Sequence, residues 1–425
     1  MSRAAPEPAA ETDIADFLVA LGEAMVDAGD PVTHVRASLE RVAPALGAVG
    51  TEVVVLATAL FVSVPGSTST HTAVASAGGR PLRLDQVDDL FRLVDDAEAG
   101  SVAALHGLKR LQEIRDRPPP FSDAARVAGY AVLAFGIALI LRGSWVDVAV
   151  ATGLGLLVGV VEVAVRRFAP SFGVFLPVAA AFGVALAVFL LVDVLPELSV
   201  TTPLIAPLVI FLPGALLTTA VIELSTGQMI SGSGRLSAGV MRLVLLAAGI
   251  VGAAAVAGVP TVSVTQLAAD PVPAWAPWIG VVLFGVGVVV HECARPRSAA
   301  WIILVLYVAY AAQVLSGLLL GGLVLGGVLS AFVGALVMTP VAVWAARHPS
   351  GPPALVSFMP AFWLLVPGAL GLLGITKYLG EDRVYGAASL TTAGATMVAI
   401  ALGVLLGLTA ASALADREGP SSRTA

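Results

Sequence analysis

After residue 120 the chain consists of long hydrophobic runs interrupted only by glycine, proline and single charges. A helix needs about 20 apolar residues to cross about 30 Å of hydrocarbon. By this measure the pattern predicts ten membrane-spanning helices, with approximate boundaries 124–142, 145–165, 172–192, 203–222, 237–258, 275–292, 299–318, 320–345, 354–376 and 385–413. An even number of spans returns both ends of the chain to one side of the membrane.

Residues 11–117 have a different pattern, which predicts a small α+β domain. Apolar positions with helical spacing and the breaks between them indicate four helices, at about 14–25, 32–46, 85–96 and 101–115. Two strand-like runs, 52–64 and 70–76, flank the turn pair Pro65-Gly66 and indicate a hairpin. Three prolines at 118–120 end the domain.

Composition supports an integral membrane protein. Hydrophobic residues make up 58% of the chain and charged residues 12%, about half the charged share of a soluble domain. The formal net charge of −6 gives no indication of a nucleic-acid partner. Acidic residues at 11, 13 and 16 argue against a cleaved signal peptide. Residues 1–10 and 414–425 are expected to be disordered.

The placement of basic residues predicts the orientation, because cytoplasmic connections carry an excess of arginine and lysine. With both termini in the cytoplasm, the inner connections hold Arg115, Arg117, Arg126, Arg166, Arg167, Arg235, Arg242, Arg295, Arg297, Arg347 and Arg417. The outer connections then hold only Arg142, Lys377 and Arg383. We therefore expect a multi-pass protein of the cytoplasmic membrane with residues 11–117 on the inner side.

A tetrapeptide occurs twice inside apolar spans. Pro213-Gly214-Ala215-Leu216 returns as Pro367-Gly368-Ala369-Leu370, and at the same offset of 154 residues Gly232 corresponds to Gly386 and Gly249 to Gly403. Five spans per repeat would place the halves, 124–258 and 275–413, in opposite orientations, as in many carriers built from inverted repeats with broken helices. The alternative is two ordinary proline kinks in unrelated spans.

The two breaks predict the substrate site. A helix that begins at Pro213-Gly214 or at Pro367-Gly368 directs free amide groups toward its N-terminus, where a carboxylate binds, and carbonyls before the break accept from an ammonium group. A small zwitterion matches both. Thr218 and Thr219 lie one turn beyond the first break and are candidates for binding a substrate hydroxyl; alternatively, they bond to their own helix.

Charges within the spans are candidates for ion coupling, because they are costly at membrane depth. Glu223 is the candidate proton carrier, and the alternative is that it caps a helix or pairs with Arg235. Glu162 lies four residues before Arg166 and is expected to form a structural ion pair with it near the inner surface and not to carry a proton. His291 ends the sixth span beside Arg295, where a histidine can titrate near physiological pH; placement at the membrane interface is the preferred interpretation.

Residues 225–235 predict a gate. This glycine-rich and hydroxyl-rich segment links two spans, so its backbone can approach a ligand closely. Gly227, Gln228, Gly232 and Arg235 are the candidate gating residues, and a simple flexible connection is the alternative.

Three segments together resemble the threonine/serine exporter family: AGDPVTHVR at 28–36, the run 207–235 with its PG, STGQMISG and GR elements, and the second PG-containing half. The resemblance implies a ten-span inner-membrane carrier with a cytoplasmic first domain that uses the proton gradient to expel small hydroxy amino acids. Similar systems have been linked to export of small dicarboxylates. The chain departs from the family pattern at Asp30-Pro31.

Two other function classes are weaker. A hydrolase-like activity in the first domain would draw on a serine, a histidine and an aspartate among Ser63, Ser67, His34, His71, His106, Asp85 and Asp88, but there is no G-x-S-x-G motif. A passive channel is the other alternative. No nucleotide-binding or metal-binding motif is present, so we expect no cofactor and no enzyme. The glycine pairs at 321–322 and 326–327 indicate close helix packing, either within one protomer or in a homo-oligomer.

Overall fold

The computed structural model describes residues 11–66, 70–259, 270–320, 326–365, 367–379 and 383–417. The chain divides into two compact units. Unit 1 comprises Met1–Pro120 and Thr219–Leu236, and unit 2 comprises Phe121–Thr218 and Ser237–Ala425. Of the ends that were expected to be disordered, 1–10 and 418–425 lie outside the described residues, whereas residues 414–417 belong to the last helix.

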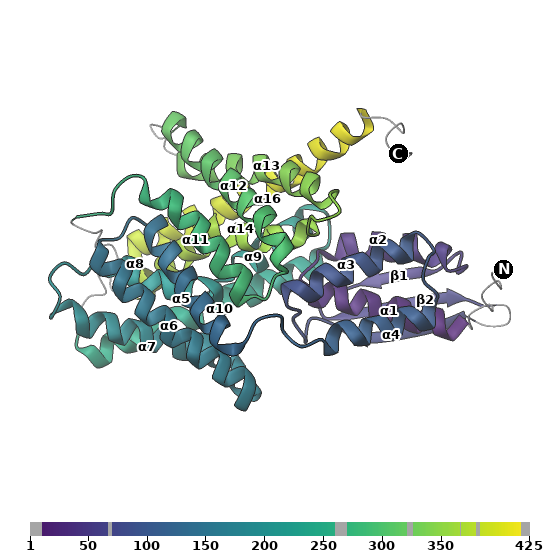
Figure 1. Ribbon diagram of the computed structural model, residues 1–425, viewed down its shortest axis with the longest axis horizontal. Helices are drawn as coiled ribbons and strands as arrows, with labels where there is room; N and C mark the ends of the chain where they lie inside the picture. Colours follow the sequence, from purple (N-terminus) through teal and green to yellow (C-terminus); the bar gives the residue numbers. More distant parts are fainter. Residues whose placement is uncertain are drawn as a thin grey trace. The chain divides into compact units, whose positions relative to one another are not determined.

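Unit 1 contains a three-stranded antiparallel sheet and four helices before the spans begin (Figure 1). Its elements are α1 (Glu11–Asp27), α2 (Val32–Ala45), β1 (Glu52–Val55), β2 (Ala59–Pro65), β3 (Thr70–Ser76), α3 (Leu84–Glu98) and α4 (Ala104–Asp116). The four predicted helices are present. The prediction of a single strand over 52–64 was wrong, because the chain turns at 56–58 and β1 pairs with β2.

Helix α1 lies at the centre of this α+β packing. Gly22 faces Leu60 of β2 and Leu39 of α2, so closely that a Cβ at this position would lie 2.5 Å from the Leu60 side chain. On another face of α1, the Phe17 ring packs against Gly107 of α4. The helix is therefore held between the sheet and α4, and its apolar side chains are almost fully buried.

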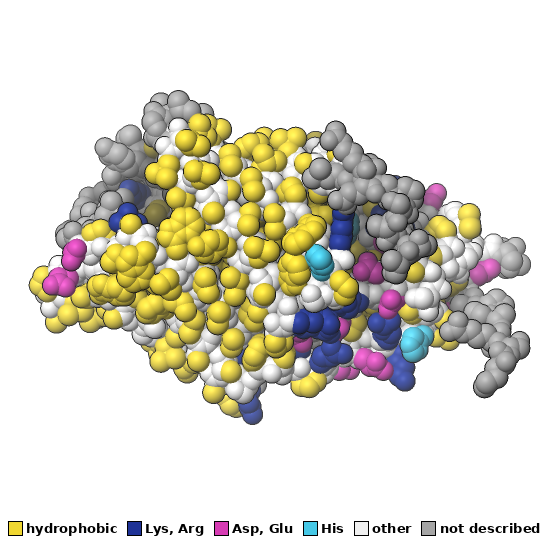
Figure 2. Space-filling view, turned by 45° about the horizontal axis from the view of Figure 1, so that its top comes forward, with side chains coloured by type: hydrophobic (Ala, Val, Ile, Leu, Met, Phe, Trp, Pro, Cys, Tyr) yellow, Lys and Arg dark blue, Asp and Glu magenta, His cyan; other side chains and the backbone are white. Residues whose placement is uncertain are grey.

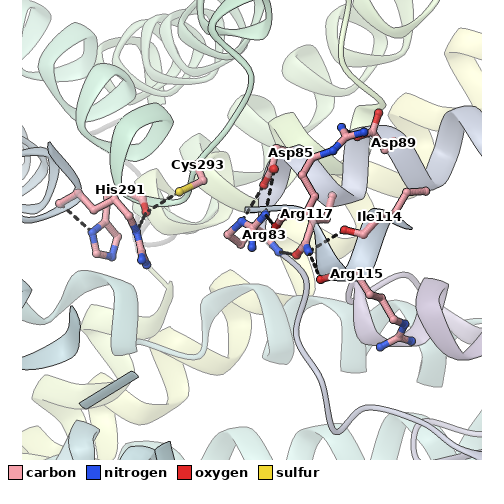
Figure 3. Close-up of polar contacts among 10 residues, drawn as sticks. Arg83, Asp85, Asp89, Ile114, Arg115, Arg117, His291 and Cys293 are labelled. Atoms are coloured by element: carbon pink, nitrogen blue, oxygen red, sulfur yellow. Dashed lines mark hydrogen bonds and ion pairs between the residues drawn. The ribbon is translucent and has the colours of Figure 1, made fainter. Parts of the chain in front are cut away.

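Polar contacts fix the end of α4 against the start of α3 (Figure 3). The Arg83 guanidinium pairs with Asp85 and donates to the Arg117 carbonyl oxygen at 2.8 Å. Gln86 donates to the Ile114 carbonyl oxygen, which would otherwise be one of the unpaired carbonyls at a helix end. Arg117 also forms an ion pair with Asp89.

The remaining helices form the apolar part of the chain. They are α5 (Asp123–Ile140), α6 (Trp145–Phe168), α7 (Leu176–Val192), α8 (Thr201–Ile205), α9 (Gly214–Ser225), α10 (Met229–Ala257), α11 (Ala276–His291), α12 (Ala299–Leu320), α13 (Gly326–Ala346), α14 (Ala354–Leu364), α15 (Pro367–Leu379) and α16 (Arg383–Arg417). Three 3₁₀ segments accompany them: η1 (Pro170–Val174), η2 (Ala206–Phe211) and η3 (Pro296–Ser298).

The described part of the chain contains six helices that are long and apolar enough to cross a membrane, or seven if the bent pair Thr201–Phe211 and Gly214–Ser225 is one span. Helices α7, α11 and α14 are apolar but shorter. The count of ten spans therefore stays a prediction. The surface of the helices supports their assignment to the membrane: Leu156, Leu157 and Val160 of α6 are each about half exposed, and hydrophobic side chains cover broad areas with few charges (Figure 2).

The helix boundaries follow the sequence offset of 154 residues. When the first residues of α5 to α10 are shifted by 154, each falls within four residues of the start of α11 to α16, in order. Thus α6 at Trp145 corresponds to α12 at Ala299, and α10 at Met229 corresponds to α16 at Arg383. The correspondence extends to helices that contain no repeated tetrapeptide.

Helix packing follows the same offset. A Cβ at Gly249 of α10 would lie 2.7 Å from the Val178 carbonyl oxygen of α7. A Cβ at Gly403 of α16 would lie 2.6 Å from the Phe332 carbonyl oxygen of α13, and both residues of this second pair lie 154 positions after those of the first. In each half, a glycine lets the last helix approach the backbone of its neighbour.

Helices α5 and α11, which correspond at this offset, pack against each other. Gly129 of α5 lies against Val290, and Gly136 lies against Phe284, so the helices run antiparallel. Midway between these contacts Gly287 packs against Leu133, the residue 154 positions before it. Equivalent positions meet at the centre of this interface. The interface is therefore nearly self-complementary, like the isologous contact between two identical subunits.

Candidate functional site

The first predicted break is present. The axis bends by 59° between Thr201–Phe211 and Gly214–Ser225. Leu212 adopts an extended conformation, and Pro213 accepts a hydrogen bond through its carbonyl oxygen from Leu217 N at 2.9 Å. Pro213 therefore occupies the cap position of α9, and Gly214 is its first residue.

The second half has a helix start at the equivalent place. Helix α14 ends at Leu364, and α15 begins with Pro367 and Gly368 in its first turn. Proline is suited to a first turn, because the amide hydrogen it lacks has no acceptor within the helix there. Each half thus has a helix N-terminus inside an apolar segment, and such an N-terminus favours an anionic group.

Buried hydroxyl groups lie on the helices that flank the breaks. The Thr218 side chain in α9 is fully buried, and its Oγ1 makes no hydrogen bond with any described residue. The alternative that Thr218 bonds to its own helix was therefore wrong. Thr219, on the same helix, is also buried.

Sequence reasoning missed two further residues of this kind. Ser357 of α14 and Thr376 of α15 are fully buried, and their hydroxyl groups likewise lack a hydrogen-bond partner among the described residues. An unpaired hydroxyl in an apolar interior costs free energy, so such groups mark places where a polar ligand or water binds. The available signal was a serine or threonine inside an apolar segment beside a repeated Pro-Gly pair.

Glu223, the candidate proton carrier, is fully buried within unit 1. Its Oε1 accepts a hydrogen bond from Val32 N at 3.1 Å and lies 3.2 Å from Arg235 Nε. Because Val32 is the first residue of α2, the carboxylate stabilises the N-terminus of that helix. The predicted alternative, capping and pairing with Arg235, is present in the structure, and proton transfer by Glu223 stays a prediction.

Asp30 and His34 extend this cluster within unit 1. The Asp30 carboxylate is buried and lies 2.7 Å from His34 Nδ1, while its carbonyl oxygen accepts from Arg235 at 3.3 Å. Burial raises the pKa of Asp30, although the bond to His34 opposes the shift. The same bond is the main reason that the pKa of His34 is raised. The departure from the family pattern at Asp30-Pro31 thus lies where α2 contacts the start of α10.

The predicted loop over 225–235 is much shorter in the structure. Helix α9 ends at Ser225 and α10 begins at Met229, so Gly232 and Arg235 are helical and only Gly227 and Gln228 of the four gating candidates lie in the connection. Gly227 has a positive φ of 83°, which permits the tight turn. Gly232 then lies against α9, where a Cβ would lie 2.9 Å from the Ala220 carbonyl oxygen.

The residues considered for hydrolase chemistry have other partners. The Ser63 hydroxyl bonds to Thr72, His34 bonds to Asp30, and Asp85 pairs with Arg83. Ser67 lies outside the described residues. Within the described part of unit 1, these contacts do not link a nucleophile, a base and a carboxylate to one another.

A second polar cluster lies in unit 2. The predicted ion pair between Glu162 and Arg166 is confirmed, with 2.6 Å between Oε1 and Nη2. His291 was expected at the interface, but its side chain is fully buried and lies 3.1 Å from the second oxygen of Glu162. The His291 side chain is thus buried against Glu162 within unit 2, and the placement of the end of α11 at the membrane interface stays a prediction.

A helical protein with several apolar spans, a bent span and buried polar groups beside the bend belongs to the class of membrane transporters. A family model described as "Putative threonine/serine exporter" matches residues 16–257, and the chain belongs to this family. Over 419 residues it is 27% identical to the "Probable threonine/serine exporter" of Mycobacterium tuberculosis (strain ATCC 25618 / H37Rv), covering 94% of this chain and 77% of that protein. No solved structure matches the chain.

Proposed function

We propose that this protein is a secondary transporter that exports threonine and serine across the cytoplasmic membrane, driven by the proton gradient. The observation that carries this proposal is the buried Thr218 hydroxyl, which has no hydrogen-bond partner among the described residues and lies one turn from the N-terminus of α9. A hydroxy amino acid has a carboxylate for the helix N-terminus and a hydroxyl group for the threonine. Family membership supports an exporter rather than an enzyme.

We further propose that residues 124–258 and 275–413 are inverted repeats of five helices each. The shared glycine contacts of Gly249 and Gly403 and the antiparallel packing of α5 with α11 support this arrangement. In such carriers one half rocks against the other, and the site lies between the two broken helices. Pro213-Gly214 and Pro367-Gly368 would then hold the substrate carboxylate, with Thr218 and Thr219 on its hydroxyl group.

The remaining predicted roles fit the same scheme. Both termini face the cytoplasm, so the α9–α10 connection with Gly227 and Gln228, together with Gly232 and Arg235 in the first turns of α10, lies at the inner end of the first broken span and controls access to it. Glu223 lies at the same end and carries a proton. The bilayer and a small zwitterion are the partners required by this scheme.

Counterflow in proteoliposomes tests the proposal. Purified protein should exchange labelled threonine or serine, and a panel that includes small dicarboxylates identifies the cargo. Thr218→Val keeps the size of the side chain and removes its hydroxyl group, so threonine counterflow should fall by about 5- to 150-fold, the range for a lost buried hydrogen bond of 1–3 kcal/mol.

Thr339→Val is the matched control, because Thr339 is equally buried and its hydroxyl group bonds to the Ala335 carbonyl oxygen of its own helix at 2.8 Å. It should leave threonine exchange nearly unchanged. Exchange of dicarboxylates alone would reassign the substrate, and flux without exchange would indicate a channel.

A further inference from the structure

His291 and Glu162 form a buried contact between the two proposed halves of the transporter. Their side chains are 0% and 3% exposed, and His291 Nε2 lies 3.1 Å from Glu162 Oε2. Glu162 belongs to α6 in the first half, and His291 is the last residue of α11 in the second. Neither atom has another hydrogen-bond partner among the described residues, and the contact is an ion pair only when His291 is protonated.

The other ring nitrogen fixes the tautomer of His291. Nδ1 lies 3.1 Å from the carbonyl oxygen of Arg126. A carbonyl oxygen only accepts hydrogen bonds, so Nδ1 carries a hydrogen. In neutral His291 the Nε2 lone pair would then face the Glu162 carboxylate, and two acceptors at 3.1 Å repel each other. The contact is favourable only when one additional proton resides on His291 Nε2 or on Glu162.

The surroundings balance this charge and offer a path to water. On α6, Arg166 pairs with the other oxygen of Glu162. On α5, the Tyr130 ring lies against the His291 ring, and Arg126 donates to the His291 carbonyl oxygen. Next to His291, the Glu292 carboxylate lies 3.8 Å from Nε2, and the Glu292 side chain is 20% exposed. The Cys293 thiol donates to the His291 carbonyl oxygen (Figure 3). A proton can therefore reach the pair through Glu292, the partly exposed acid beside it.

Tyr130 links the pair to the broken span. Its ring lies edge-on to the His291 ring at 4.8 Å, and its hydroxyl group donates to the Pro207 carbonyl oxygen at 2.7 Å. Pro207 belongs to η2, the segment that ends at the break before Pro213. A movement of His291 away from Glu162 would thus be transmitted through packed side chains to the segment that precedes the proposed substrate site.

We propose that His291 and Glu162 together form a proton-binding site that couples proton movement to the transport cycle. One proton binds between Nε2 and the carboxylate when the His291 and Glu162 side chains are in contact, and it leaves to water through Glu292 when the two halves separate. No covalent bond is made or broken except those of the moving proton. This inference rests on the proposed function, in which a proton gradient drives transport.

Transport assays separate coupling from substrate binding. In proteoliposomes His291→Gln and Glu162→Gln should each lower threonine accumulation driven by a pH gradient by about 5- to 150-fold, the span typical of coupling between two sites. Counterflow at equal pH should persist in both variants and lose its dependence on pH. His348→Gln is the control, because His348 stacks on Trp301 away from the pair and should retain driven accumulation.

Protonation can also be measured without transport. Nitrogen-15 spectra of the histidine rings in the detergent-solubilised full chain, assigned with His291→Gln, should show both ring nitrogens of His291 protonated near neutral pH. If the proton resides on Glu162 instead, the infrared spectrum should contain a protonated carboxyl band that Glu162→Gln removes. A neutral His291 without such a band would overturn the proton site.

The outcomes distinguish the two proposals. Wild-type protein that exchanges none of the tested compounds would refute the proposed function, while the spectra would still decide the protonation of the pair. If the wild-type protein shows gradient-driven transport and both His291→Gln and Glu162→Gln retain it, the coupling role of the pair is refuted. Loss of drive in Glu223→Gln alone would assign coupling to Glu223 and not to the pair.

Discussion

Glu223 occupies a position at which loss of the carboxylate leaves a buried cation without its counter-ion. The Arg235 side chain is 10% exposed, and the α2 N-terminus also contacts this carboxylate. We expect Glu223→Ala to lower the free energy of unfolding by about 3–5 kcal/mol, as for other broken buried ion pairs. Thermal unfolding of the detergent-solubilised protein would measure the effect.

The matched control for this prediction is Glu40→Ala. Glu40 pairs with Arg36 on an exposed face of α2, and such pairs contribute about 0–1 kcal/mol. Glu223→Gln should be milder than Glu223→Ala, because the amide oxygen still accepts from Val32 N. Equal losses in Glu223→Ala and Glu40→Ala would contradict the structural role assigned to Glu223.

We expect the contact between His34 and Asp30 to make the free energy of unfolding depend on pH. Its folded-state pKa is raised above the ordinary value of 6.5, mainly by the hydrogen bond to Asp30. Below pH 6.5 the histidine is protonated in both folded and unfolded protein, so the stabilisation is fully present; it is lost as the pH rises through the folded-state pKa. Asp30, whose pKa is raised by burial, changes stability in the same direction over its own lower range.

The melting temperature of unit 1 should therefore fall as the pH rises above about 6.5, and His34→Asn should remove most of that slope. The matched control is His106→Asn, since His106 is exposed on α4. Scanning calorimetry of the full chain at a series of pH values measures the slope. An unchanged slope in His34→Asn would exclude the Asp30–His34 contact as its origin.

At the scale of elements, we expect alanine substitutions at Gly249 and Gly403, which lie at equivalent positions of the two halves, to lower stability by similar amounts. Gly249→Ala and Gly403→Ala each place a Cβ within 2.7 Å of a carbonyl oxygen in the neighbouring helix. Backbone atoms give way less than side-chain ends, so each change should destabilise unit 2 by about 1–3 kcal/mol. Thermal unfolding and the yield of monodisperse protein would report the loss.

Two other glycines on the same helices serve as controls. A Cβ at Gly252 of α10 would make only ordinary contacts, at 3.7 Å, and a Cβ at Gly394 of α16 would have no neighbour within 4 Å. Alanine at these positions should be neutral or slightly stabilising, because alanine has the higher helix propensity. A large loss at Gly249 without one at Gly403 would argue against the shared packing.

At the scale of the whole molecule, the proposed orientation predicts which connections face each side. In a Cys293→Ser background, cysteine at Ser171 should be labelled only from the cytoplasmic side and cysteine at Val194 only from outside. Both positions are exposed and flank α7. A membrane-impermeant thiol reagent, applied to oriented vesicles of each sidedness, measures access. Labelling of both positions from one side would refute the orientation.

Much of the architecture was predictable because it depends on the pattern of residues that are close together in the sequence. The four helices of residues 11–117, the bend at Pro213-Gly214 and the ion pair of Glu162 with Arg166 all follow from short-range patterns. The turn that separates β1 from β2 and the early start of α10 were missed, because apolar residues continue through the first and glycines interrupt the second. Tertiary packing overrode the local signal at both places.

The sequence by itself determined that this is a polytopic helical membrane protein, since apolar length is a property of the chain order, and its repeated Pro-Gly pairs predicted two related halves. Only the tertiary structure decided which polar groups meet. Val32 reaches Glu223 across 191 positions, and His291 approaches Glu162 through the packing of α11 near α6. Burial and distance decide the chemistry of a charged group, and both depend on segments far apart in the sequence.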